Sequence, residues 1–300
     1  MLIGGIEYIL QSNDNANCVA AEDRFKFVDD LTVIELVSLA SLITNYDFKS
    51  HVASDVGIDE FFIPADHLQS QQHLDNIAEW TQDRKMKINE NKTKYMVFSR
   101  SNTEFATRLK MNNKVIDRIE ETKLVGVWVT TFLDWEKNTR EICKKAYARI
   151  PMLTKLKYVG VRTEDLIHLY ILFIRCILEY CAVVWHSTLT VQQSKDIEKV
   201  QKLVLKIILG DRYINYENAL RLTGLESLSD RREQKCLQFG LKSLLHPIHC
   251  KNFPVNPDKI YNTRNSEHFK VNLAHSEYYR KSTIPYVQRL LNQYVRNMDK

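Results

Sequence analysis

The sequence lacks several features that would assign it to a class at once. Its six cysteines include no Cys-x-x-Cys pair, so free thiols in a reducing compartment are the expected state. No charged N-terminal segment precedes an apolar stretch, as a secretory signal requires, and no internal repeat is present. We therefore expect an intracellular protein, nuclear or cytoplasmic, that is not secreted.

No hydrophobic run is both long and free of charge. The best candidate for a membrane span, residues 166–185, contains His168, Arg175 and Glu179. Each central charge costs about 2.5–3.5 kcal/mol on insertion, against about 0.3–0.6 kcal/mol gained per Leu or Ile. The charges therefore favour a buried core helix, and we expect no membrane partner.

What the sequence does have is the composition of a folded protein. Of its 300 residues, 44% are hydrophobic and 26% charged, with a net charge of +5. This length is enough for one large or two modest domains. The mild positive charge is compatible with nucleic-acid binding and with simple solubility, so the distribution of charge matters more than its sum.

The pattern of the chain changes near residue 130. Residues 1–24 are weakly patterned, whereas 25–130 mix short β-prone runs with a helical pattern at 66–85, an α+β arrangement. That helix has an apolar face made of Leu74, Ile77, Ala78 and Thr81. Strands are expected at 95–98, 115–119 and 124–129. Residues 131–250 predict helices at 134–158, 163–185, 192–209, 216–222 and 230–245. The polar segment 251–300 is expected to be a partly disordered tail.

Two adjacent acids lie between two β-prone runs. Asp29 and Asp30 are flanked by Phe25–Val28 and by Leu31–Ile34, which predicts a β-hairpin with the acids at its tip. Mg²⁺ ions that assist nucleotide transfer need carboxylates on a rigid support, and such a hairpin can present them. The alternative is an ordinary turn that favours Asp.

Segments downstream of these acids resemble, in the same order, the reverse transcriptases of non-LTR (jockey/LINE-like) retrotransposons. The first is KFVDDLT at 26–32, which is similar to palm motif C, followed by LDNIAEWTQDRKMKIN at 74–89, similar to the next palm helix. NENKTK at 89–94 resembles the N-x-x-K-T of motif D, and KLVGV at 123–127 resembles motif E near the primer grip. The resemblance implies a partial palm, a β-hairpin plus helix within 25–130, followed by an all-helical thumb-like region within 131–250.

The resemblance also implies roles for individual residues. Asp29 is the metal-binding acid of motif C, and Asp30 supports the same Mg²⁺ (or Mn²⁺) site. Lys92 corresponds to the motif D lysine, which would lie near the incoming triphosphate and protonate the leaving group. Lys94 is an equally available cation. The implied ancestral activity is RNA-directed DNA polymerisation on an RNA/DNA primer–template duplex.

The family places a second metal-binding aspartate in motif A and a nucleotide pocket in motif B, both upstream of motif C. Only 28 residues precede Asp29, and they contain neither motif. Asp14 and Asp23 do not lie in an apolar strand. We therefore expect a C-terminal part of the polymerase that is inactive by itself and whose partner is the missing N-terminal half.

The helix expected at 134–158 has a basic face. Lys137, Arg140 and Lys144 follow i, i+3, i+7 spacing, while the opposite side carries Ile142, Ala146, Leu153 and Leu156. A polymerase thumb lays such a face along the phosphates of the primer–template duplex. An ordinary solvated face is the alternative.

Other interpretations stay open at this point. The chain can be a non-catalytic remnant that binds nucleic acid. Residues 134–178 also resemble a short helical module of AlkB-homologue tRNA-modifying dioxygenase–methyltransferases, although the iron-binding jelly roll of that family has no counterpart. His73-x-Asp75 and the set Cys236, His246, His249 and Cys250 contain metal-binding residue types, but neither has the context or spacing of a known site.

Overall fold

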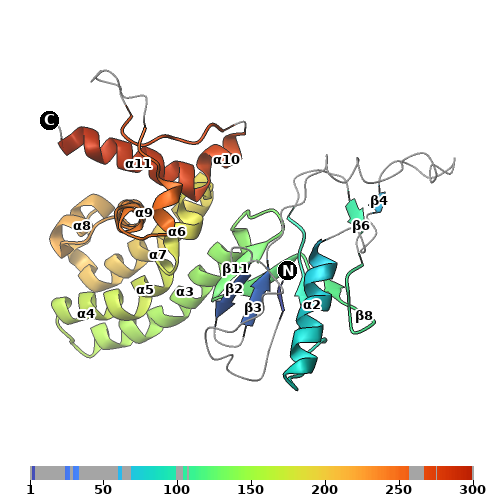
Figure 1. The fold of residues 1–300 in the computed structure, drawn as a ribbon. Coiled ribbons are helices and arrows are strands. Elements are labelled where there is room, and N and C mark those ends of the chain that lie inside the picture. The colour runs from blue at the N-terminus through green and yellow to red at the C-terminus, as the bar shows by residue number, and fades with distance from the viewer. Residues whose placement is uncertain are drawn as a thin grey trace. The chain divides into compact units, whose positions relative to one another are not determined.

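A computed structural model describes residues 69–98, 108–256, 267–274 and 276–298, together with the backbone of short strands at 2–3, 24–27, 30–33, 60–62 and 104–106. The chain divides into two compact units. The sheet unit comprises Met1–Thr122 and Thr130–Leu133, and the helical unit comprises Lys123–Val129 and Asp134–Lys300. The chain therefore mixes helix and sheet, as the sequence predicts at this level (Figure 1).

The main sheet of the first unit has five strands in the order β2-β3-β1-β5-β9. Their bounds are Arg24–Phe27, Asp30–Val33, Leu2–Ile3, Lys94–Tyr95 and Asp117–Arg118 respectively. Strand β1 runs antiparallel to both of its neighbours, β3 and β5. Strands β3 and β5 therefore run in the same direction, one on each side of β1.

Helix α2 (Gln69–Asp83) lies between β3 and β5 along the chain. The predicted apolar face is confirmed, because Leu74, Ile77, Ala78 and Thr81 are all buried. The helix is tied to β7 (Lys110–Met111) by the side-chain amide of Gln71, which accepts from the Lys110 N–H and donates to its carbonyl, each at 2.9 Å. Two further strand pairs complete the unit, β4 (Glu60–Phe62) with β6 (Glu104–Ala106) and β7 with β8 (Lys114–Val115).

The strand predicted at 124–129 is wrong, because those residues include a turn. Strand β10 (Glu121–Leu124) and strand β11 (Val127–Thr130) form a hairpin. Val125 and Gly126 connect them, with φ angles of 45° and 86°. Two successive positive φ angles match the twist of a two-residue hairpin, so backbone geometry overrides the apolar pattern here.

Most helices of the second unit lie where the sequence predicts them. The matching elements are α3 (Glu136–Tyr158), α7 (Val191–Leu209), α8 (Tyr216–Thr223) and α9 (Leu228–Leu244). Helix α7 begins with a capping box between Thr190 and Gln193. The helix predicted to begin at residue 134 has its N-cap at Trp135, and the Asp134 carboxylate accepts from the Glu136 N–H at 3.1 Å.

The single helix predicted at 163–185 is broken instead. Helix α4 (Thr163–Leu169) passes into a π-helix, Tyr170–Arg175, then into α5 (Cys176–Leu178), and α6 (Ala182–Trp185) follows after a turn. The break lies at Glu179, whose buried carboxylate is held by Arg231 and Lys235. No single helix among the described residues is long and apolar enough to cross a membrane. The helix pair Thr163–Leu178 and Ala182–Thr188, bent by 44°, meets the criteria of length and composition for a membrane span only when the two are taken together.

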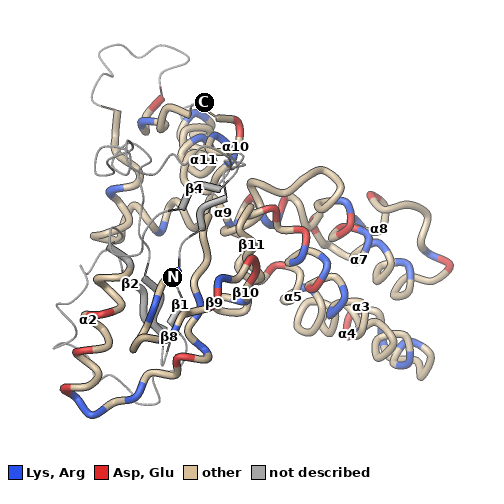
Figure 2. Tube along the Cα trace, turned by 90° about the vertical axis from the view of Figure 1, so that its right-hand side faces the viewer, with Lys and Arg blue, Asp and Glu red and all other residues tan. Residues whose placement is uncertain are grey.

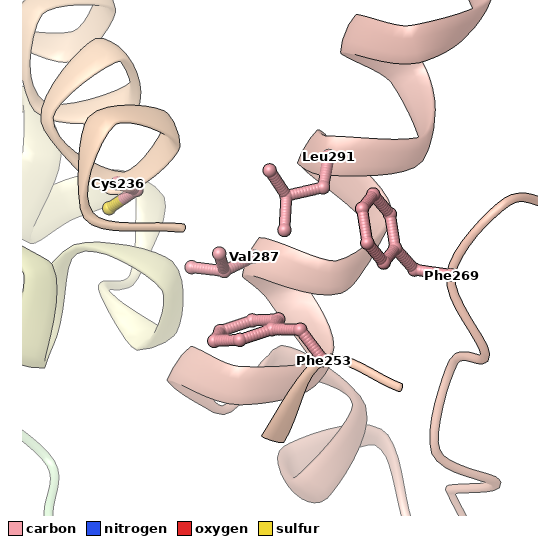
Figure 3. Close-up of a cluster of buried hydrophobic side chains, with 5 residues drawn as sticks. All are labelled: Cys236, Phe253, Phe269, Val287 and Leu291. Carbon is pink, nitrogen blue, oxygen red and sulfur yellow. The ribbon is translucent and has the colours of Figure 1, made fainter. Parts of the chain in front are cut away.

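The expectation of a disordered tail is wrong for residues 276–298. They form α10 (Glu277–Lys281) and α11 (Thr283–Met298), and α11 packs against α9. Val287 and Leu291 of α11 join Cys236, Phe253 and Phe269 in a buried cluster (Figure 3). The Asn292 side chain accepts from the Phe269 N–H at 2.7 Å and donates to the Phe269 carbonyl at 2.9 Å. A side-chain amide that makes this segment polar in sequence therefore serves as a buried hydrogen-bond partner.

Candidate functional site

The hairpin predicted around the paired acids is confirmed. Strands β2 and β3 are antiparallel and Phe27 pairs with Asp30, so only Val28 and Asp29 connect them. Asp30 is the first residue of β3. Asp29 and the Asp30 side chain lie outside the described residues, and the positions of their carboxylates stay a prediction.

The strand beside this hairpin carries no acid in its described residues. Strand β1 consists of Leu2 and Ile3, and Ile3 pairs with Leu31, the residue after Asp30. An acid opposite the hairpin, which the resemblance requires in motif A, is thus not supplied by β1. Within 71–98, 108–256, 267–274 and 276–298, no group of three or more His, Cys, Asp or Glu side chains is placed to hold a metal ion.

The N-x-x-K-T segment forms a tight turn directly before β5. The Asn89 carbonyl accepts from the N–H groups of Lys92 and Thr93, both at 3.1 Å, and its side-chain oxygen accepts from the Lys92 N–H at 3.2 Å. The Thr93 hydroxyl donates to the same carbonyl at 3.1 Å, and Thr93 is fully buried. Asn89 and Thr93 therefore fix the turn, which explains why these two residue types frame Lys92.

The structure separates the two candidate lysines of this turn. The Lys94 ammonium pairs with the Asp117 carboxylate of β9, and this hydrogen bond lowers the pKa of Asp117. Lys92 is exposed, and its ammonium has no partner among the described residues. Lys94 therefore holds β5 to β9 through its ion pair with Asp117, and Lys92 is the lysine of this turn that is available to a ligand.

The predicted basic face of α3 is present but divided. Arg140 and Lys144 are exposed, and the opposite face is buried through Ile142 and Leu153, among others. Lys137 is only half-exposed, because its ammonium lies 3.9 Å from the centre of the Trp128 ring. Arg140 and Lys144 are thus open to an anion, whereas Lys137 is engaged by an aromatic ring.

Sequence reasoning missed the residues that hold the tip of the β10–β11 hairpin, which resembles motif E. The Tyr180 hydroxyl donates to the Val125 carbonyl at 2.9 Å. The Trp128 N–H donates to the Asn138 side chain at 3.2 Å. A Cβ on Gly126 would lie 3.1 Å from the Tyr180 ring, so a glycine is needed for close approach as well as for its positive φ. No local pattern marks Tyr180, which is 54 residues from Gly126 in the sequence.

Buried charges in the helical unit have structural partners. The Glu179 side chain is 5% exposed and contacts Arg231 at 2.5 Å and Lys235 at 2.7 Å. Burial raises the pKa of the Glu179 carboxyl, but these two hydrogen bonds outweigh it, and the net shift is downward. This cluster connects Glu179, at the helix break that follows α5, with Arg231 and Lys235 of α9. Its role is therefore structural, because it holds two helical segments together.

Another buried charge, the cation Arg232, has neutral hydrogen-bond partners and no carboxylate partner among the described residues. It is fully buried and donates to His186 Nδ1 at 3.3 Å and to the Ser194 hydroxyl at 2.9 Å. Burial and the nearby guanidinium lower the pKa of His186 to about 4. A neutral imidazole that accepts at Nδ1 carries its proton on Nε2, which faces the Tyr286 hydroxyl of α11 at 3.3 Å.

In comparisons with known proteins, no family model, no curated protein and no solved structure matches this chain. Two features of the described residues bear on function: the sheet that contains the acid hairpin and the exposed Arg140 and Lys144 of α3.

Proposed function

We propose that the chain is the C-terminal part of a reverse transcriptase of the non-LTR retrotransposon kind, consisting of part of the palm and a thumb. In this proposal Asp29 and Asp30 belong to a Mg²⁺ or Mn²⁺ site, Lys92 lies near the triphosphate, and the helical unit contacts the primer–template duplex. The activity of the complete protein would be RNA-directed DNA polymerisation.

The register of the sheet is the observation that carries the proposal. Leu2 of β1 pairs with Thr32 on one side and with Lys94 on the other. Since β3 and β5 are parallel, Asp30 at the start of β3 and the Lys92 turn before β5 lie at the same end of the sheet. Two strand spacings separate them, on the order of 10 Å between backbones. An acid hairpin and a cation at one sheet end suit a metal-bound triphosphate.

The connection from β3 through α2 to β5, with β1 between the two strands, is a split β-α-β unit. It supports the proposal because this connection brings Asp30 and Lys92, which lie 62 residues apart in the sequence, to the same end of the sheet. Lys94 anchors β5 through Asp117, which leaves the preceding turn to present Lys92.

The residues present do not complete a two-metal site. Two ions held about 3.5–4 Å apart need carboxylates from more than one side, and β1 contributes only Leu2 and Ile3. Mg²⁺ also tolerates poor geometry badly. We therefore derive no catalytic step from these residues alone and propose that a segment with motifs A and B is required.

The test is nucleotide incorporation on a primed RNA template, with Mg²⁺ and with Mn²⁺. The chain alone should give no incorporation above background, and Asp29→Ala should change nothing. When a polypeptide carrying motifs A and B is supplied, incorporation should appear and should be lost in Asp29→Ala. Incorporation by the chain alone that Asp29→Ala abolishes would show that its metal site is complete. Failure of every complemented mixture would count against the polymerase assignment.

A further inference from the structure

A second row of basic side chains, absent from the sequence predictions, lies on α7. Lys195, Lys199, Lys202 and Lys206 follow i, i+4, i+7, i+11 spacing, and all four are exposed. At about 100° per residue they fall within about 60° of one another and extend over about 16 Å of helix. Figure 2 colours the Lys and Arg positions of the chain blue along the Cα trace. We call this row the α7 lysine stripe.

The acids of α7 do not neutralise the stripe. Asp196 accepts from Lys199 at 2.7 Å and from Gln192 at 2.8 Å, so it offsets one lysine. Glu198 turns inward, where its carboxylate accepts from the Leu228 N–H at 3.0 Å.

The remaining lysines of the stripe keep their charge uncompensated. Lys195, Lys202 and Lys206 have no carboxylate partner within the residues that the structure describes. The ammonium of Lys202 lies 4.9 Å from the centre of the Tyr216 ring, a contact that leaves its positive charge intact.

The stripe adjoins the basic face of α3. Helices α3 and α7 pack along each other. Tyr147 follows Arg140 and Lys144 at helical spacing on α3, and it lies within electrostatic reach of Lys199 and Asp196. The two basic rows therefore approach each other near Tyr147.

We propose that the α7 lysine stripe, together with Arg140 and Lys144, contacts the phosphates of duplex nucleic acid without reading its sequence. This inference rests on the proposed function and extends its binding surface to a second helix. A duplex carries one negative charge per about 1.7 Å of axis, so a row of about 16 Å faces several phosphates. Lysines on flexible stems act as point charges that position a backbone.

The chemistry of α7 favours a duplex over a single strand or a lipid surface. Its sequence contains no aromatic residue, so it offers no platform on which unpaired bases can stack. The exposed large apolar side chains of α7 are Val191, at 72%, and Leu203, at 40%. They are separated by about three helical turns, whereas an interfacial membrane helix exposes a continuous apolar face.

The experiment measures binding of the full chain to an RNA/DNA hybrid duplex of fixed sequence across a series of salt concentrations. One variant combines Lys195→Gln, Lys202→Gln and Lys206→Gln. Its matched control, with the same charge change, combines Lys242→Gln, Lys251→Gln and Lys270→Gln, which are exposed lysines of the same unit outside α3 and α7. Circular dichroism checks that both variants stay folded.

Each lost phosphate contact should reduce the slope of log K against log salt by about 0.9. The stripe variant should therefore lose about 2–3 units of slope, and the control should keep the wild-type slope. Equal slopes for the two variants would overturn the proposal, and so would a stripe that supports binding to anionic phospholipid vesicles but not to duplex. The result is separable from the polymerase assignment, because it is measured without nucleotides and without motifs A and B.

Discussion

In the sheet unit the candidate residues lie on strands of two to four residues and on tight turns, whereas in the helical unit they lie on helices of up to 23 residues. The turn at Asn89 is held by a few local hydrogen bonds, while the ionic cluster around the buried Glu179 carboxylate joins two helical segments. Local turn chemistry therefore positions Lys92, whereas contacts between residues far apart in the sequence join helices of the second unit.

The largest expected effect is on the buried ionic tie of the helical unit. Glu179→Gln removes the charge that Arg231 and Lys235 share, and it leaves these cations crowded and partly buried. Breaking such a cluster from one side should lower the free energy of unfolding by about 3 kcal/mol. Urea unfolding followed by circular dichroism measures this change.

The control for this prediction is Glu277→Gln, which removes an acid that pairs with Arg280 and Lys281 at the surface. Exposed pairs contribute little because solvent screens them, so this variant should unfold close to the wild type. Similar midpoints for both variants would show that the helical unit does not depend on buried ionic ties.

A smaller effect is expected from pH. His186 is neutral in the folded protein, with its pKa lowered from 6.5 to about 4, and it faces Arg232 of α9 and Tyr286 of α11. Below pH 6.5 the unfolded chain binds a proton that the folded chain does not bind until about pH 4. The contribution of His186 to the free energy of unfolding should therefore be fully present above pH 6.5. It should fall by roughly 2–3 kcal/mol as the pH is lowered from 6.5 to about 4.

His186→Gln keeps a side-chain oxygen that can accept from Arg232 but cannot be protonated. This variant should lose most of the pH dependence between 6.5 and 4.5, measured as the urea midpoint at each pH. An identical dependence in the variant would assign the acid sensitivity to other groups, such as the Glu179 carboxyl, whose lowered pKa acts at lower pH.

The smallest expected effect is on the turn of the sheet unit. Asn89→Ala removes the side-chain acceptor of the Lys92 N–H and should cost about 1 kcal/mol. Asn89→Asp retains an acceptor oxygen and should cost less. Hydrogen exchange at Lys92 and Thr93 reports the loosening of this turn, and equal protection in both variants would mean that Thr93 alone is enough to hold it.

The sequence predicts elements whose signal is local and periodic. The face made by Leu74, Ile77 and Thr81 repeats at helical spacing, and α7 spans Val191–Leu209 where the sequence predicts 192–209. The hairpin of β2 and β3 is likewise local. These elements need no knowledge of distant partners.

The features that escaped prediction depend on residues far away in the chain. The break at Glu179 reflects Arg231 and Lys235, which follow it by about 50 positions. The role of Lys94 became clear only from its pairing with Asp117. Strand β1 is two residues long, which is too short for any periodic pattern of apolar residues to predict it. The α7 lysine stripe is the exception, since its spacing is visible in the sequence.

The β10–β11 hairpin has a consequence for anyone who divides this protein for expression or exchanges its parts. Residues 123–129 belong to the helical unit although residues on both sides of them, up to Thr122 and Thr130–Leu133, belong to the sheet unit. A single cut between Leu133 and Asp134 would strip Tyr180 and Asn138 of their hydrogen-bond partners at Val125 and Trp128. The two units are interleaved along the chain, so modular transfer of the helical unit has to include the hairpin from Glu121 onward.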